Sequence, residues 1–341
     1  MNKQESERIS IFDRFNASAL MLLTSEYKTL EKVRKKNRYP SFPTFNFPES
    51  MPMQYETING VEIRYAHSSA EGKPTLVLLS PFPQSILAYA PIWGHLAKHY
   101  NLYAYDMPGF GRSGGSFEFM SFKAQGDFLK VFLEHFQIKN AHLLGPDVGM
   151  PAVLYYVAMY ENSVKSILVG DGPAINPSSN ASSIRKMVNS GFWRTVFRAT
   201  GSGALIQGCI KVCYTNYHPN EEEISDYIAS YRNRMPEAMQ WFKDYQKSID
   251  TLDPLLSKIE VPTKIFWGDQ DAILYVDNGE RLAERMPNSE LTVFKDCGHF
   301  CYQDKHLEFL EMVISWIANC EGFQVNQNSL SESDKESLHD K

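Results

Sequence analysis

The fold is decided by one stretch of the sequence, AHLLGPDVGMPAVLYYVAMY at residues 141–160. Its first five residues predict a short buried strand, and the residues from Gly149 onward predict a helix with Pro151 in its tolerant first turn. A tight turn between Gly145 and Gly149 joins the two elements. Such a strand-turn-helix unit exposes the side chain at its middle and sets a backbone N–H beside it. The exposed residue is Asp147.

The chemistry of Asp147 has two interpretations. A carboxylate is a weak nucleophile toward acyl groups, but it is competent for displacement at saturated carbon. Aspartate is also favoured at the N-terminal cap of a helix, where its role is structural. The turn alone fits both interpretations, so the decision rests on residues elsewhere in the chain.

Short apolar runs on both sides of this unit predict a sheet. They occupy residues 75–80, 101–106, 141–145, 166–171, 263–268 and 291–296, and a hairpin of residues 53–58 and 61–66 around Asn59-Gly60 precedes them. Continuous apolar strands are typical of parallel sheets covered on both faces. Helical patterns lie between most of the runs, for example at residues 122–137, 149–160 and 303–318. The predicted class is therefore α/β, with a mostly parallel eight-stranded sheet and helices on both faces.

One long interval lacks a strand pattern. Within residues 173–257 the sequence predicts helices around 184–198, 204–214, 222–234 and 237–249. An insertion that enters at the carboxyl end of a strand lies over the sheet edge where α/β proteins bind ligands. We therefore expect a core made of residues 53–172 and 258–320, and a helical cap made of residues 173–257.

The two ends of the chain differ from the core. Residues 1–52 are expected to form an N-terminal extension, with an amphipathic helical stretch over 5–38 and a linker that contains Pro40, Pro43, Pro48 and Pro52. The basic run at residues 32–38 is interpreted as a solvated helix end in preference to a contact with an anionic membrane. Residues 321–341 are polar and aperiodic and are expected to form a tail.

Composition narrows the classes of function. The chain of 341 residues has a net charge of -6, so it lacks the basic surplus of a nucleic-acid-binding protein. No apolar run approaches the roughly 20 residues that span a bilayer. Five scattered cysteines without zinc-ligand spacing predict a cytoplasmic protein with no metal. We expect a small-molecule substrate, no cofactor, and either a monomer or a homodimer.

Two further residues follow later strands and complete a reactive set with Asp147. Asp271 ends the segment WGDQD at residues 267–271, and His299 lies in DCGHF at residues 296–300. Because the carboxyl ends of parallel strands share one edge of a sheet, we expect Asp147, Asp271 and His299 to meet there. Histidine is suited to act as a base near neutral pH, and a carboxylate fixes its tautomer.

One string points to a different nucleophile. The segment GRSGG at residues 111–115 matches the G-x-S-x-G pattern of serine esterases. That motif needs a strand, a turn and a helix in immediate succession, but the next helical pattern begins only near residue 120. Ser113 is therefore rejected as the nucleophile.

The segment DMPGFGRS at residues 106–113 resembles the D-x-P-G-x-G-x-S loop of the α/β-hydrolase superfamily, and the resemblance extends over about residues 53–320. An aspartate at the central turn resembles the epoxide hydrolase and haloalkane dehalogenase branch, whose members pass through an alkyl-enzyme ester. The resemblance implies that Asp147 is the nucleophile and His299 the base. Asp271 is the expected acid, and Asp171, at the end of the preceding strand, is the alternative.

The resemblance also implies donors for the oxyanion. The segment SPFP at residues 80–83 occupies the place of the H-G-x-P segment of this branch, with Ser80 and Pro81 in place of His and Gly. The backbone N–H groups of Phe82 and Val148 are therefore the expected donors. Val148 stands where dehalogenases usually carry a tryptophan that binds the halide.

Three cap residues are the substrate-binding candidates: Tyr231, Trp241 and Tyr245. A phenol is a good hydrogen-bond donor to an opening epoxide oxygen, as family epoxide hydrolases use it. We therefore expect an epoxide hydrolase. The alternatives are a haloalkane dehalogenase-like hydrolase and a non-catalytic ligand-binding protein on the same fold.

Overall fold

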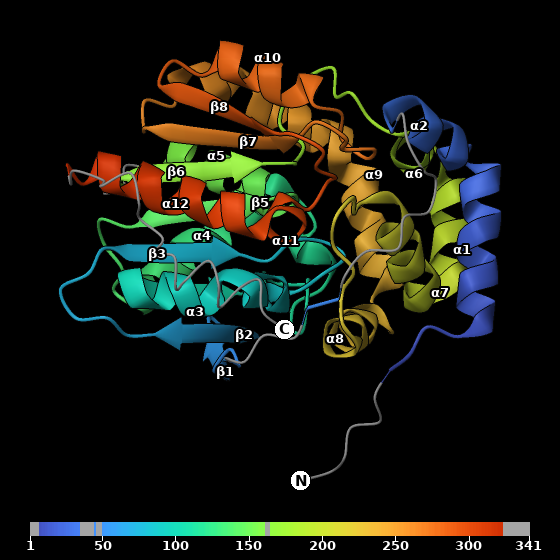
Figure 1. Ribbon diagram of the computed structural model, residues 1–341, viewed down its shortest axis with the longest axis horizontal. Coiled ribbons are helices and arrows are strands. Elements are labelled where there is room, and N and C mark those ends of the chain that lie inside the picture. The colour runs from blue at the N-terminus through green and yellow to red at the C-terminus, as the bar shows by residue number, and fades with distance from the viewer. Residues whose placement is uncertain (1–6, 35–43, 46–49, 161–163, 323–341) are drawn as a thin grey trace, which may run out of the picture.

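The computed structural model describes residues 7–34, 44–45, 50–160 and 164–322 (Figure 1). Its centre is a sheet of eight strands in the order β1-β2-β4-β3-β5-β6-β7-β8. The strands are β1 (Met53–Ile58), β2 (Val61–Ser68), β3 (Thr75–Leu79), β4 (Asn101–Tyr105), β5 (His142–Pro146), β6 (Ser166–Gly170), β7 (Thr263–Gly268) and β8 (Ser289–Phe294). The β1–β2 and β2–β4 pairs are antiparallel, and the other neighbouring pairs are parallel. The predicted α/β class and mostly parallel sheet are confirmed.

Helices cover both faces of the sheet. One face carries α3 (Ala90–His99) and α12 (His306–Cys320), which lie in front of the sheet in Figure 1. The other face carries α4 (Phe122–His135), α5 (Gly149–Met159) and α10 (Asp277–Arg285). Strand β3 shows why both faces are apolar, because Val77 and Leu79 enter one core while Leu76 and Leu78 enter the other. Short helices occur at η1 (Ile86–Tyr89), η2 (Phe117–Phe119) and α11 (Cys301–Asp304).

A helical insertion separates β6 from β7. It contains α6 (Ser182–Asn189), α7 (Gly191–Val212), α8 (Glu221–Tyr231), α9 (Met235–Leu252) and η3 (Asp253–Lys258). Figure 1 shows α6 to α9 gathered at one end of the sheet. The prediction of one helix over 184–198 is wrong, because the chain turns at Ser190, whose side chain caps α7 by accepting from the Trp193 N–H. Helix α7 then kinks at Gly201, where φ is 79°.

The N-terminal region forms two helices where the sequence predicted one stretch over 5–38. Helix α1 (Ile11–Leu23) is separated from α2 (Glu26–Val33) by Ser25, whose φ of 64° ends the first helix. Helix α1 packs against α7, and α2 packs against α6. The helices therefore lie on the outer side of the helical insertion (Figure 1).

Several predictions for the chain ends fall outside the described residues, namely Pro40, Pro43 and Pro48 of the linker and positions 323–341 of the tail. Glu321 caps α12, and its carboxylate accepts a hydrogen bond from the Lys165 ammonium. Among the helices described, none combines the length and the apolar character that a membrane span requires.

A buried ion-pair cluster joins the helical insertion to the sheet. Arg64 on β2 binds Asp106 after β4, with 2.6 Å between Nε and Oδ2. The other two guanidinium nitrogens bind the carboxylate of Asp226 on α8, at 2.7 and 2.9 Å. Because buried charges are costly unless they are paired, this bidentate contact fixes α8 on the core.

Candidate active site

Asp147 occupies a sharp turn between β5 and α5. Its φ of 49° lies in the left-handed region, which few residues other than glycine adopt. Neighbouring glycines allow this close packing, since a Cβ on Gly145 would lie 2.5 Å from the Gly149 carbonyl oxygen and one on Gly172 would lie 2.3 Å from that of Asp147. The structure thus contains the tight turn that the sequence predicted, and Asp147 is 7% exposed.

The structure brings Asp271 and His299 to Asp147. The Nδ1 atom of His299 lies 2.7 Å from Asp271 Oδ2, and its Nε2 atom lies 3.7 Å from Asp147 Oδ1. The other carboxylate oxygen of Asp271 accepts hydrogen bonds from the N–H groups of Ile273 and Leu274 at 2.8 and 3.0 Å. Asp271 is therefore rigidly held, and it orients the imidazole so that Nε2 faces Asp147.

The electrostatics of His299 depend on both carboxylates. Burial by itself lowers the pKa of His299, but the negative charges of Asp271 and Asp147 outweigh burial and raise the pKa well above its ordinary value. The resting site therefore favours the imidazolium. Any reaction that neutralises Asp147 removes one of these two charges and makes the imidazole easier to deprotonate.

Asp171, the alternative acid, is hydrogen-bonded to the backbone and not to the His299 imidazole, which binds Asp271. It is fully buried at the end of β6, where its Oδ1 accepts a hydrogen bond from the Gly268 N–H at 3.3 Å. Its Oδ2 has no hydrogen-bond partner among the described residues. Burial, and next the charge of Asp271, raise the pKa of Asp171 well above its ordinary value. A neutral carboxylic acid fits this place, and Asp271 is the better candidate for the acid.

Variants of the two acids are expected to differ in rate. Asp271→Asn should slow hydrolysis by about 10⁴-fold, because the imidazolium loses its stabilising charge and its tautomer is no longer fixed. Asp171→Asn should stay within about tenfold of the parent, since asparagine replaces a carboxyl that is already neutral. Steady-state turnover of the two variants measures the difference, and the reverse ordering would transfer the acid role to Asp171.

The same Asp171→Asn variant is expected to change the pH dependence of stability. The folded state retains the Asp171 proton over a pH range in which the unfolded chain has already lost it. This contribution to stability is therefore lost as pH rises from about 4 toward the folded pKa. Asparagine does not titrate. The melting temperature of the variant, relative to that of the parent, should therefore rise as pH increases from about 5 toward the folded pKa of Asp171. A pH-independent difference in thermal unfolding would contradict this expectation.

One of the two predicted oxyanion donors contacts Asp147. The Phe82 N–H donates to Asp147 Oδ2 at 2.6 Å, which leaves Oδ1 on the side of His299. Val148 follows Asp147 and lines the apolar pocket described below. The role of its N–H as the second donor stays a prediction.

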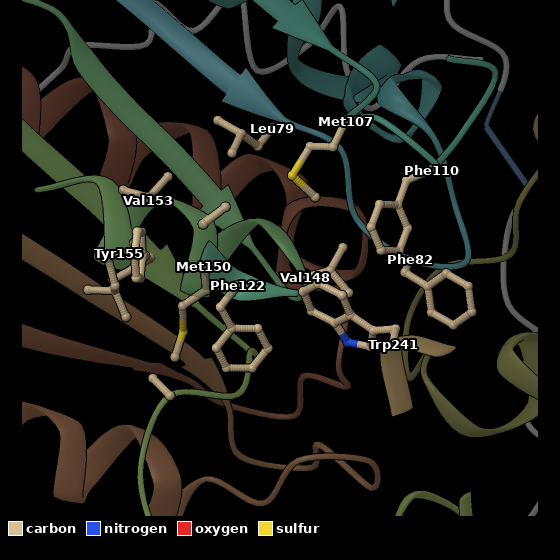
Figure 2. Packing of buried hydrophobic residues seen from close by; sticks show 14 of the residues in the cluster. Leu79, Phe82, Met107, Phe110, Phe122, Val148, Met150, Val153, Tyr155 and Trp241 are labelled. Carbon is tan, nitrogen blue, oxygen red and sulfur yellow. The ribbon is translucent and has the colours of Figure 1, made fainter. Parts of the chain in front are cut away.

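An apolar pocket opens onto Asp147 and His299. Trp241 and Tyr245 of α9 line it, as do Phe82 and Val148. Figure 2 shows Trp241 beside Phe82, Phe110 and Val148, and its ring lies edge-on to Phe110 with 5.3 Å between ring centroids. The Tyr245 hydroxyl lies 3.3 Å from Ser178 Oγ and 3.4 Å from Asn180 Oδ1.

Tyr231 is placed elsewhere. It is not among the described residues that line the pocket, and its hydroxyl accepts from the Gly111 N–H and donates to the Gln84 carbonyl at 3.0 and 3.1 Å. Its ring packs edge-on against Phe82. Tyr231 thus supports the turn that carries Phe82, and this position does not favour a role in contacting substrate.

The N-terminal helices also line the pocket, which sequence reasoning missed. The contributing residues are Ala17, Leu20, Met21, Thr24 and Glu26. Glu26 is buried and accepts a hydrogen bond from the Ser183 N–H at 2.5 Å. The apolar periodicity of residues 11–23 indicated a helix, but only tertiary packing shows which pocket that helix covers.

Ser113 has a structural role. Its hydroxyl donates to the Asp106 carbonyl at 2.5 Å and accepts from the Arg64 N–H at 2.9 Å, and its side chain is fully buried. It lies in the loop that supports the ion-pair cluster, away from the strand-turn-helix unit.

Fold, turn and pocket define a hydrolase of the α/β class. Residues 74–305 match the family model described as "alpha/beta hydrolase fold", and the chain belongs to this family. It is 23% identical over 285 residues to the monoacylglycerol lipase ABHD6 of Mus musculus, covering 76% of this chain and 83% of the relative.

Solved structures share the same architecture. A putative lipase from Acinetobacter baumannii has a TM-score of 0.70 at 17% identity, covering 94% of this chain and 100% of that chain. The haloalkane dehalogenase DbeA of Bradyrhizobium elkani has a TM-score of 0.69 at 17% identity, covering 80% of this chain and 99% of that chain. At such identity the likeness concerns the fold.

Proposed function

We propose that the chain hydrolyses an apolar small molecule through an alkyl ester on Asp147, and that an epoxide is its substrate. The proposal rests on one observation: Phe82 holds Asp147 Oδ2 while Oδ1 lies toward His299 at the wall of the apolar pocket. A carboxylate held in this way is suited to attack a saturated carbon.

In the first step Asp147 Oδ1 attacks a ring carbon of the epoxide, and the bond from that carbon to the ring oxygen breaks. The nascent alkoxide takes a proton from the hydroxyl of Tyr245, a residue that lines the pocket. Burial raises the pKa of Tyr245, so the phenol stays protonated and able to donate until the alkoxide forms. Asp147 is now a neutral ester.

In the second step water attacks the ester carbonyl carbon of Asp147. Alkylation removes one of the charges that held the His299 imidazolium, so the ring gives up its proton, which restores the Tyr245 hydroxyl by way of solvent. The neutral imidazole then takes a proton from the attacking water. The Phe82 N–H stabilises the oxyanion on Oδ2. Collapse of the tetrahedral intermediate breaks the bond between Cγ and Oδ1, and the departing alkoxide takes the second proton of the water. A diol is released, and Asp147 is again a carboxylate that carries one water oxygen.

Haloalkane dehalogenation is the second candidate. The same ester would form with halide as leaving group, and the indole N–H of Trp241, which lines the pocket, is a donor for halide. The Val148 side chain next to Asp147 offers no such donor, which favours the epoxide. An acyl ester is disfavoured because carboxylates are weak nucleophiles toward acyl groups.

Two subordinate expectations accompany the proposal. The helical insertion, as residues 173–257, would act as the cap over the pocket. The cytoplasmic location is supported by the five cysteines, which are all free thiols in the structure.

The test is a panel of aliphatic and aryl epoxides and of chloro- and bromoalkanes, assayed for diol and for halide release. Diol formation from epoxides supports the proposal, and halide release as the only activity transfers it to the dehalogenase. Tight binding of panel members with no turnover would favour the ligand-binding alternative.

A further inference from the structure

Helix α1 has apolar side chains on its outer as well as its inner face. Ala17, Leu20 and Met21 point inward and are buried, in contact with the helical insertion and the pocket. The outer residues are Ile11, Phe12, Phe15, Leu22 and Leu23, which are 86%, 79%, 70%, 68% and 62% exposed. Their spacing places them on one side of a helix, opposite the buried residues.

Phe192, at the start of α7, is a sixth residue of this surface. Lys186 on α6 donates to the Leu23 carbonyl at 2.6 Å and lies 4.4 Å from the Trp193 ring centroid. Trp193 packs on Phe192, which is 70% exposed. Among the described residues these six are the most exposed large hydrophobic side chains of the protein, and they lie on contiguous elements. We call them the outer apolar face.

The segments around this face are basic. Residues 8–34 and 172–220 together contain ten Lys and Arg against three Asp and Glu, although the whole chain has a net charge of -6. Asp13 caps α1, and Glu26 binds the Ser183 N–H. Exposed basic residues on these elements include Arg14 on α1 and Arg198 on α7.

We propose that the outer apolar face binds the surface of an anionic lipid bilayer. Helix α1, with 13 residues, is about 20 Å long, too short to cross a hydrocarbon core of about 30 Å but suited to lie in the interface. Aromatic and aliphatic side chains would enter the boundary between headgroups and acyl chains, and the surrounding Lys and Arg would meet anionic headgroups.

A second copy of the chain fits this face less well. A twofold dimer sets the same surface against itself, so the basic elements of the two copies would oppose each other. Like charges brought together in this way oppose association, whereas an anionic bilayer attracts them. The proposal concerns docking and does not depend on the reaction proposed for Asp147.

The test is cosedimentation of the full chain with vesicles of phosphatidylcholine and phosphatidylserine in equal amounts, and with vesicles of phosphatidylcholine alone. The parent protein should sediment with the anionic vesicles, and high salt should weaken binding because it screens the headgroup charge. The double variant Phe12→Glu with Phe15→Glu should bind at least about tenfold more weakly. Both side chains are exposed, so the fold should survive, which thermal unfolding checks.

The matched control is the double variant Tyr55→Glu with Phe117→Glu, which changes two exposed aromatic residues outside the face in the same way. It should bind as the parent does. Absence of the parent from the vesicle pellet, or equal binding by both double variants, would overturn the proposal. So would a parent dimer that binds no vesicles and is dissociated by Phe12→Glu with Phe15→Glu, as measured by sedimentation velocity.

Discussion

Asp147→Asn is expected to lower turnover by about 10⁴-fold or more, since removing the nucleophile of a covalent mechanism removes its first step. Asparagine tolerates the φ of 49° and can still accept from the Phe82 N–H, so the variant should fold. Its turnover, measured on any substrate found in the panel, decides between a nucleophilic and a structural Asp147. Activity within tenfold of the parent would exclude the nucleophilic role.

Transfer of an oxygen isotope from water to Asp147 tests the covalent mechanism directly. In a single turnover of the parent enzyme in heavy-oxygen water, the label should appear on the Asp147 carboxylate, because water attacks the ester carbonyl and an enzyme oxygen leaves with the product. Mass spectrometry of the peptide that contains Asp147 measures this, with enzyme incubated without substrate as the control. Label found in the product alone would show direct attack of water on the substrate.

The second large effect is expected from His299→Gln. Glutamine cannot accept the water proton, so ester hydrolysis should slow by about 10⁴-fold or more while ester formation continues. The alkylated enzyme should therefore accumulate, and intact-protein mass spectrometry should show a mass increase equal to the substrate. The parent enzyme, in which the ester turns over, should show little of it.

The matched control for this variant is His135→Gln, which changes an exposed histidine of α4 that pairs with Glu56. It should turn over as the parent does and accumulate no adduct. A His299→Gln enzyme with unchanged turnover would remove His299 from the mechanism.

Most of the fold could be predicted from local patterns. The apolar runs located six strands within a few residues, because buried parallel strands leave little freedom in composition, and the hairpin pattern located the other two. The meeting of Asp147, Asp271 and His299 followed from parallel topology, since each lies in the segment that follows the carboxyl end of a strand. Asp271 could be preferred to Asp171 from its place in the sequence, and the 2.7 Å contact to His299 agrees with that preference.

Other features depend on contacts between segments far apart in the sequence. The helices are broken at Ser25 and Ser190, but the apolar periodicity is helical on both sides of each break. A prediction from periodicity therefore runs the helix through both positions. Tyr231 is a tyrosine of the helical insertion, a residue type suited to bind substrate. Its hydroxyl, however, is hydrogen-bonded to Gly111 and Gln84, more than a hundred residues away in the sequence. The cover that α1 provides over the pocket is set by packing on α7, which no local pattern encodes.

The ion-pair cluster around Arg64 has a consequence for how molecules reach the pocket. It fixes α8 on the sheet by buried, bidentate contacts, whereas the residues by which α1 lines the pocket are apolar. Opening is therefore expected to pivot about α8 and to separate α1 from the core. If α1 rests on a bilayer, this entrance faces the lipid, and a substrate dissolved in the membrane would find the enzyme by diffusing in two dimensions.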